Sequence, residues 1–148
     1  MQLPSTAYRQ RGLSMVEILV AIVVLSIGLL GLAGLQANSL RTSQSALYRS
    51  QAATFAEDMA ERMRANLGGA RTYEIDMSAA APTGTSVADR DRAEWLARLA
   101  NLPAGDGAIA IDAVNRTVTI TVQWDDSRAG GPTDANYTLV TRIWNTND

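Results

Sequence analysis

The chain has 148 residues, a formal net charge of -2, and neither cysteine nor histidine. These counts exclude a Ser-His or Cys-His nucleophile pair within the chain, an ordinary structural zinc site and any disulfide bond. All 13 basic residues are arginines spread from Arg9 to Arg142, so no basic block indicates a nucleic-acid-binding surface. The length suffices for one domain but not comfortably for two.

A long apolar segment lies near the start of the chain. Residues 1–12 are polar and carry Arg9 and Arg11 with no acid, whereas residues 13–35 contain a single charge, Glu17. As a helix, residues 13–35 would span roughly 34 Å, slightly more than the hydrocarbon core of a bilayer at about 30 Å. The sequence therefore predicts a membrane-spanning helix. The two preceding arginines predict a cytoplasmic N-terminus, with everything after the span across the membrane.

Two simpler interpretations of the apolar segment account for less of it. A cleaved secretory signal peptide has an apolar stretch of about 7 to 15 residues and a small-x-small cleavage site, but this run is longer and Leu35 occupies the outer small position. A plain single-pass anchor leaves Glu17 unexplained, because an acid in a membrane helix costs up to about 3 kcal/mol at the centre, and less near an end. Glu17 is therefore a candidate functional residue, the alternative being that its carboxylate simply reaches the interface.

The sequence around Glu17 resembles a known processing signal. Residues 12–17 read GLSMVE and follow a short basic leader, which resembles the class III signal of type IV prepilins. The continuation over residues 18–36, ILVAIVVLSIGLLGLAGLQ, resembles the PilV family of minor pilins, the type IV pilus modification proteins. The close resemblance covers about residues 10–36, and the rest of the chain is similar to the family in layout rather than in motif.

The resemblance implies roles for individual residues. Prepilin peptidase would cut between Gly12 and Leu13 on the cytoplasmic side and methylate the new amine on Leu13. Most pilins have phenylalanine at the position of Leu13, so the chain departs from the family's pattern there. Glu17 would act in assembly, by meeting the positive N-terminus of a neighbouring subunit or of its own chain.

Three glycines recur at every third residue within the apolar segment: Gly28, Gly31 and Gly34. A glycine seam permits close approach of helices in a membrane, and each glycine also weakens a helix by about 1 kcal/mol, so the seam is a place to stretch or unwind. The alternative is the ordinary enrichment of glycine in membrane helices.

Helical periodicity continues beyond the membrane boundary. Apolar residues recur at spacings of four, seven or eight, and Gly68 and Gly69 end the pattern, which predicts one helix over residues 13–67. Its C-terminal half should pack on the globular head of the same chain, in preference to a partner or cofactor groove. The predicted apolar stripe consists of Leu40, Leu47, Phe55, Met59, Met63 and Leu67.

A second helix and a small sheet are predicted in the remainder. After a Gly/Ala/Pro-rich stretch over residues 68–85, a capping-box-like start at Ser86 and a closing Pro103 define a short helix. Residues 117–124 alternate Val, Ile or Trp with polar residues, as a half-buried strand does. Residues 108–112 and 137–144 are its predicted antiparallel partners, joined through a hairpin link and a longer loop.

The predicted fold class is therefore α+β and type IV pilin-like, with a long N-terminal transmembrane and spine helix packed against a small antiparallel β-sheet head. We divide the chain into a prepilin leader (1–12), a transmembrane segment (13–35) and a periplasmic or extracellular head that includes the amphipathic half of the helix (36–148).

The head offers only weak candidate sites. Asp125, Asp126 and Asp134 flank one loop and have oxygen ligands suited to calcium, but without EF-hand spacing they are better interpreted as turn formers. Apart from Glu17, no acid falls in an apolar sequence context, so paired-carboxylate catalysis has no support. We expect no enzyme activity, no cofactor and no metal.

Two functions are consistent with these features: a minor type IV pilin that takes part in initiating or modifying pilus assembly, and a minor pseudopilin of type II secretion. Residues 26–36 favour the first, and a membrane-anchored periplasmic protein is a remote third. The partners implied by the resemblance are other minor pilins, the major pilin, prepilin peptidase, the inner-membrane assembly platform and a tip adhesin. The implied location is the inner membrane of a Gram-negative bacterium and then the pilus at the cell surface.

Overall fold

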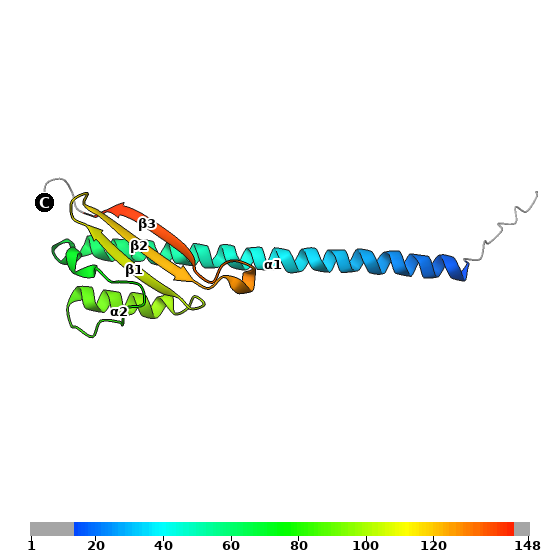
Figure 1. The fold of residues 1–148 in the computed structure, drawn as a ribbon, viewed down its shortest axis with the longest axis horizontal. Helices are drawn as coiled ribbons and strands as arrows, with labels where there is room; N and C mark the ends of the chain where they lie inside the picture. Colours follow the sequence, from blue (N-terminus) through cyan, green and yellow to red (C-terminus); the bar gives the residue numbers. More distant parts are fainter. Residues whose placement is uncertain (1–13, 144–148) are drawn as a thin grey trace, which may run out of the picture. The chain divides into compact units, whose positions relative to one another are not determined.

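A computed structural model describes residues 14–143. Two compact units, Met1–Ser39 and Leu40–Asp148, divide the chain. The elements in chain order are α1 (Met15–Ala65), the 3-10 helix η1 (Leu67–Tyr73), α2 (Val87–Leu99), β1 (Asp106–Asp112), β2 (Thr117–Trp124), the 3-10 helix η2 (Ser127–Ala129) and β3 (Ala135–Arg142) (Figure 1). The predicted fold class, a long apolar N-terminal helix with a small antiparallel sheet, is confirmed.

Helix α1 ends earlier than predicted, at Ala65 rather than at residue 67. Asn66 leaves the helical region, with φ -126° and ψ 55°, and its carbonyl accepts from the Gly69 amide at 3.0 Å. Its side-chain amide also donates to the Tyr73 hydroxyl at 3.3 Å. Asparagine forms such local bonds readily, so the chain turns at Asn66, before the glycines are reached.

The buried face of α1 also differs from the predicted stripe. Leu40 and Leu47 leave 72% and 54% of their surface exposed, and Leu67 is exposed as well. Met59 and Met63 of the predicted stripe are fully buried and Phe55 packs against the core, and three alanines complete the buried face. The buried residues of α1 are Ala52, Ala56, Met59, Ala60 and Met63.

The sheet has the strand order β1-β2-β3, with both pairs antiparallel. β2 lies at the centre and matches the predicted strand, with Val118, Ile120, Val122 and Trp124 buried on one face. β1 begins at Asp106, two residues before the predicted start. β3 begins at Ala135 and ends at Arg142, whereas the predicted third strand ran on to residue 144, which lies outside the described residues.

One hydrophobic core joins the sheet to the second half of α1 and to α2, and its buried members all lie between Ala52 and Ile143. Trp95 of α2 is fully buried, and its indole N–H donates to the Phe55 carbonyl of α1 at 3.0 Å. Gly107 of β1 leaves room for the Trp95 ring, because a Cβ there would lie 2.4 Å from the ring atom Cη2. The Trp95 ring and Gly107 therefore fit together where α2 meets β1.

Helix α2 starts at the predicted capping box. The Ser86 side chain accepts from the Asp89 amide at 3.1 Å, and the Asp89 carboxylate accepts from the Ser86 amide at 3.3 Å. Charged side chains then join α2 to α1: Arg62 contacts Asp58, Asp91 and Glu94 at distances of 2.9 to 3.0 Å. These carboxylates hold the pKa of Arg62 above its ordinary value, against the desolvation that lowers it. The network is partly exposed, so it contributes little to the free energy of unfolding. Its main effect is to orient α2 against α1.

The Gly/Ala/Pro-rich stretch, residues 68–85, contains most of η1 and a short pairing to the sheet. Ile75 exchanges two backbone hydrogen bonds with Ile109, at 3.1 and 2.9 Å, and so covers part of the β1 edge. The Ser78 amide donates to the Asp106 carboxylate at 2.7 Å. Beyond Ser78 the chain runs without regular structure to the start of α2.

Candidate functional site on the N-terminal helix

The first turn of α1 carries the acid that the sequence singles out. The Ser14 carbonyl accepts from the Glu17 amide at 2.9 Å and from the Ile18 amide at 3.2 Å, which starts the helix directly before Met15. An acid in a first turn is favourably placed, because the unpaired amides there form the positive end of the helix dipole. The predicted cleavage position, Gly12 and Leu13, lies outside the described residues.

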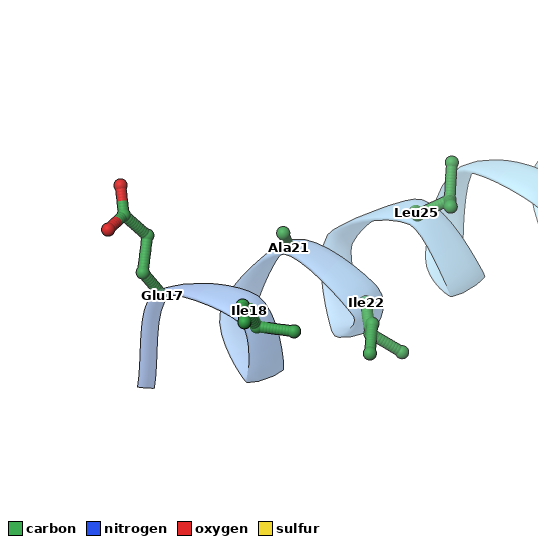
Figure 2. Close-up of a pocket in the computed structure, with 5 residues that line it drawn as sticks. All are labelled: Glu17, Ile18, Ala21, Ile22 and Leu25. Atoms are coloured by element: carbon green, nitrogen blue, oxygen red, sulfur yellow. The ribbon is translucent and has the colours of Figure 1, made fainter. Parts of the chain in front are cut away.

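The Glu17 side chain is exposed and its neighbours are apolar. Figure 2 shows its carboxylate extending away from the helix on the side that Ala21 and Leu25 also occupy, while Ile18 and Ile22 point the other way. No arginine within residues 14–143 forms an ion pair with Glu17. Any cation that neutralises Glu17 in an apolar environment must therefore come from the N-terminal residues that precede Ser14 or from another molecule.

The apolar side chains that follow Glu17 are uncovered. Large apolar residues from Met15 to Leu35 leave roughly half or more of their surface exposed. Within the described part of the chain, α1 is the one helix long and apolar enough to cross a membrane, with a mean hydropathy of 2.8 in its most apolar window. Such a continuous exposed apolar surface is not stable in water and requires lipid or other helices around it.

The three glycines of this helix have no packing role among the residues that the structure describes. A Cβ placed on Gly28, Gly31 or Gly34 would meet no atom within 4 Å. Nothing inside residues 14–143 therefore requires a glycine at these positions. Their predicted role in helix packing concerns neighbours outside this chain and stays a prediction.

The head contains one buried acid, Asp126, which the sequence predicts only as a turn former. Asp126, directly before η2, is only 5% exposed, and its Oδ2 accepts from the Ser45 hydroxyl of α1 at 2.6 Å. Its Oδ1 is buried without a hydrogen-bond partner in the described residues. The expectation that only Glu17 among the acids lies in an apolar context is therefore wrong. The sequence did contain a signal for this burial, because every second residue from Val122 through Trp124 to Asp126 is buried.

The loop around Asp126 does not form a metal centre with the other candidate acids. Asp125 accepts from the Ser127 amide at 2.9 Å, as a turn-forming aspartate does, and Asp134 is exposed. No group of three or more acids within residues 14–143 is arranged to hold a metal ion. Asp126 instead fastens the loop after β2 to α1.

Two family matches cover adjoining parts of the chain. Residues 8–33 match the prokaryotic N-terminal methylation motif, and residues 34–94 match the family described as type IV pilin Tt1218 (Tt1218-like). Together with the fold, these matches support a type IV pilin. Searches of curated proteins and of solved structures found no match.

The matches indicate general properties for the chain. The methylation motif implies cleavage and methylation by prepilin peptidase, and its range includes Gly12, Leu13 and Glu17. Pilins are structural proteins rather than enzymes, and they assemble with other pilins. The motif and the long apolar helix suggest that the protein is anchored in a membrane. The Tt1218-like match ends within α2, so the three strands lie beyond both matches.

Proposed function

We propose that this pilin is a minor subunit of the PilV type, which takes part in initiating or modifying the assembly of a type IV pilus. The observation that carries the proposal is a single acid in the first turn of α1, four residues after the predicted new N-terminus, among exposed apolar side chains that run from Met15 to Leu35. Anchoring in a membrane does not require that acid, whereas assembly with other subunits gives it a positively charged partner.

Processing prepares the helix for assembly. Prepilin peptidase cuts between Gly12 and Leu13, and glycine before the cut lets the backbone lie close to the enzyme because it lacks a Cβ. The cut removes Arg9 and Arg11, the charges that hold the N-terminus in the cytoplasm. It also creates an amine on Leu13, which the peptidase methylates and which retains its positive charge.

Glu17 then supplies the negative partner for that amine. When α1 leaves lipid for a bundle of pilin helices, the carboxylate meets the N-terminal amine of a neighbouring subunit, or that of its own chain, in a setting of low dielectric constant. Breaking such a buried pair by removing one partner is costly, typically several kcal/mol. The exposed apolar side chains of α1 supply the remaining helix contacts, with Gly28, Gly31 and Gly34 as the positions of closest approach.

The partners proposed for this subunit follow from the same steps. Prepilin peptidase and the inner-membrane assembly platform act on the anchored form, which spans the inner membrane once with its N-terminus in the cytoplasm. Other minor pilins, the major pilin and a tip adhesin bind the assembled form in the pilus at the cell surface.

Substitution of Glu17 tests the proposal. Glu17→Ala should enter the membrane and be cut as the parent chain is, because insertion prefers an apolar residue. It should be depleted from sheared pili, or fail to restore piliation in a strain that lacks the native copy. Ser26→Ala is the matched control, because it removes a polar group from the same helix that bonds only to the Ile22 carbonyl, and it should assemble normally. Normal piliation with Glu17→Ala would contradict the pairing.

The competing assignment, a minor pseudopilin of type II secretion, predicts a different loss. Deletion of the gene would then block protein secretion and leave surface pili intact. Deletion under our proposal reduces surface pili and leaves secretion intact, so one strain assayed for both properties separates the two functions.

A further inference from the structure

The sheet of the head has one edge that the described residues leave open. β2 lies between β1 and β3, so β1 and β3 form the two edges (Figure 1). Ile75 covers part of the β1 edge through its two backbone hydrogen bonds with Ile109. Within residues 14–143 no strand or bridge pairs with the outer side of β3. The fold therefore covers one edge of the sheet and leaves the other open.

The pairing pattern identifies the backbone groups of β3 that face outward. Ile109 bonds outward to Ile75, so the even-numbered residues of β1 bond inward to the odd-numbered residues of β2. By the same alternation, the even-numbered residues of β2 bond to the odd-numbered residues of β3. The remaining amides and carbonyls of β3 point away from the sheet and have no backbone partner in the described residues. They belong to Asn136, Thr138 and Val140.

The β3 edge lacks the features that protect most sheet edges. Charged side chains, prolines and bulges normally prevent an exposed edge from pairing with another strand. β3 pairs with β2 over eight residues without a bulge, and residues 135–141 contain neither a charge nor a proline. Val140 leaves 61% of its surface exposed. Such an edge can accept a further strand without rearrangement.

The charges at the two ends of β3 favour a second copy of the same strand. Asp134 directly precedes β3 and Arg142 ends it, and both are exposed. When two β3 strands pair antiparallel with Thr138 opposite Thr138 of the second copy, Asp134 of each lies opposite Arg142 of the other. One two-fold axis thus produces two pairs of opposite charge across the strands, which stabilise such a contact. A shift of the register by two residues in either direction separates these charges.

The same register continues the apolar face of the sheet. Tyr137 and Leu139 are half-buried on the side of β3 that packs against the core. In the paired strands Tyr137 lies opposite Leu139 of the second copy, at a non-hydrogen-bonded position where opposed side chains are closest. The two-fold axis produces this contact twice, so the pairing buries apolar surface as well as bonding the two edges.

We propose that β3 is a docking surface for a second copy of this chain, with the two strands antiparallel and Thr138 at the two-fold axis. Ser45 of α1 contacts Asp126, before β3 begins, at 2.6 Å. Arg64 of α1 contacts Thr141, near the end of β3, at 2.8 Å. Residues 45–64 of α1 therefore run in the same direction as β3, and the pairing sets these segments of the two copies in opposite directions. The contact thus joins copies in two separate assemblies, and the inference does not depend on the proposed function.

Disulfide crosslinking of the full-length protein, purified in detergent from the membranes of its own host, tests the pairing. The chain has no cysteine, so each substitution introduces a single thiol. Thr138→Cys places two thiols on opposed residues whose Cα atoms lie about 5.5 Å apart, within the range that a disulfide spans. Thr121→Cys is the matched control, because Thr121 pairs with Thr138 on β2 and its two copies would lie roughly 14 Å apart. Oxidation should link most Thr138→Cys chains into dimers and leave Thr121→Cys chains monomeric on a non-reducing gel.

Further variants test the register and the charges. In the proposed pairing Asn136 lies opposite Val140 of the second copy, so Asn136→Cys and Val140→Cys should each stay monomeric alone and form dimers when mixed. In the Thr138→Cys chain, Arg142→Glu should cause loss of most of the dimer, because it places two acids opposite each other. Addition of Asp134→Arg to that chain should restore the dimer.

Any of four results would overturn the proposal. Equal dimer yields from Thr138→Cys and Thr121→Cys would mean that random collisions form the disulfide. Dimers of Asn136→Cys alone, at the yield of the mixture, would exclude the register. An unchanged yield with Arg142→Glu would remove the charge pairing that selects a second copy. Crosslinking of Thr138→Cys to another protein in the host membranes, but not to itself, would make that protein the occupant of the β3 edge.

Discussion

Asp126 is the one charged residue among the described residues that is almost wholly buried. Its carboxylate has a single side-chain hydrogen-bond partner there. The Ser45 hydroxyl donates to Oδ2, while Oδ1 has no bond within residues 14–143. Gly131 packs against the same carboxylate, because a Cβ there would lie 2.4 Å from Oδ2. This contact joins the loop after β2 to α1 through one hydrogen bond to a charged group.

Removal of the Ser45 hydroxyl should therefore destabilise the head. A hydrogen bond to a buried charge contributes about 1.5 to 3 kcal/mol, so we expect Ser45→Ala to lower the free energy of unfolding by that amount in chemical denaturation. Ser43→Ala, at an exposed serine of the same helix, should change it by less than about 0.5 kcal/mol. Equal effects of the two variants would show that the Asp126 contact carries no weight.

Gly12 is the residue at which the processing step is most easily blocked. Gly12→Val leaves the apolar helix intact, so the chain should still enter the membrane, while the added side chain should prevent cleavage. An immunoblot of membranes should show the longer form only. Gln10→Val places the same side chain two residues earlier and should leave cleavage unchanged. A Gly12→Val chain that is still shortened after residue 12 would contradict the assignment of the cut.

Among the elements, β1 and α2 depend on a glycine where they meet. Gly107→Ala places a Cβ 2.4 to 2.9 Å from Trp95 and Leu99, which are both fully buried. Overpacking of this kind costs about 1 to 3 kcal/mol, and we expect the variant to melt at a correspondingly lower temperature. Gly68→Ala is the control, because a Cβ there meets nothing within 4 Å. A Gly107→Ala head as stable as the parent would show that the Trp95 ring can move without cost.

The cap of α2 and the turn after β1 make the head sensitive to acid. Hydrogen bonds from Ser86 lower the pKa of Asp89, and hydrogen bonds from Asn115 lower the pKa of Asp112, below the ordinary value of 3.8. A lowered pKa contributes stability above the unfolded value, which is lost as the pH falls through the folded value. The melting temperature should therefore decline below about pH 4, and more steeply than in Ser86→Ala. A Ser86→Ala profile that declines as steeply would contradict this cause.

The sequence predicts elements well where one pattern dominates. The alternation in β2 and the capping box of α2 each depend on neighbouring residues, so both were found at their positions. The face of α1 that is buried depends on which surface the sheet covers: Ala56 and Ala60 are buried, whereas Leu40 and Leu47, which precede the first buried residue, are exposed. Burial of Asp126 likewise requires the Ser45 hydroxyl from a distant part of the chain. Neither the buried face of α1 nor the Ser45 partner of Asp126 can be deduced from local spacing.

At the scale of the whole molecule, apolar residues are used in two different ways. Those of the first unit, from Met15 to Leu35, are exposed throughout, whereas the buried core residues all lie within the second unit. The candidate site belongs to the first unit. Residues 12–17 could be recognised from the sequence because they are consecutive. The motif of the site is local, whereas the partner proposed for Glu17, the N-terminal amine of its own chain or of a neighbouring subunit, lies outside the described residues.

The second unit should consequently fold without the first. A fragment of residues 40–148 retains every buried core residue, the Ser45 contact to Asp126 and both helix-to-helix ion pairs of Arg62 across to α2. We expect it to melt in one cooperative transition that a chelator does not shift, because its core consists of apolar side chains and needs no metal. Within this fragment, Ser45→Ala should lower the free energy of unfolding by about 1.5 to 3 kcal/mol, as in the full chain. A fragment of residues 40–148 that shows no cooperative transition in circular dichroism would mean that the anchor or a partner subunit completes the head.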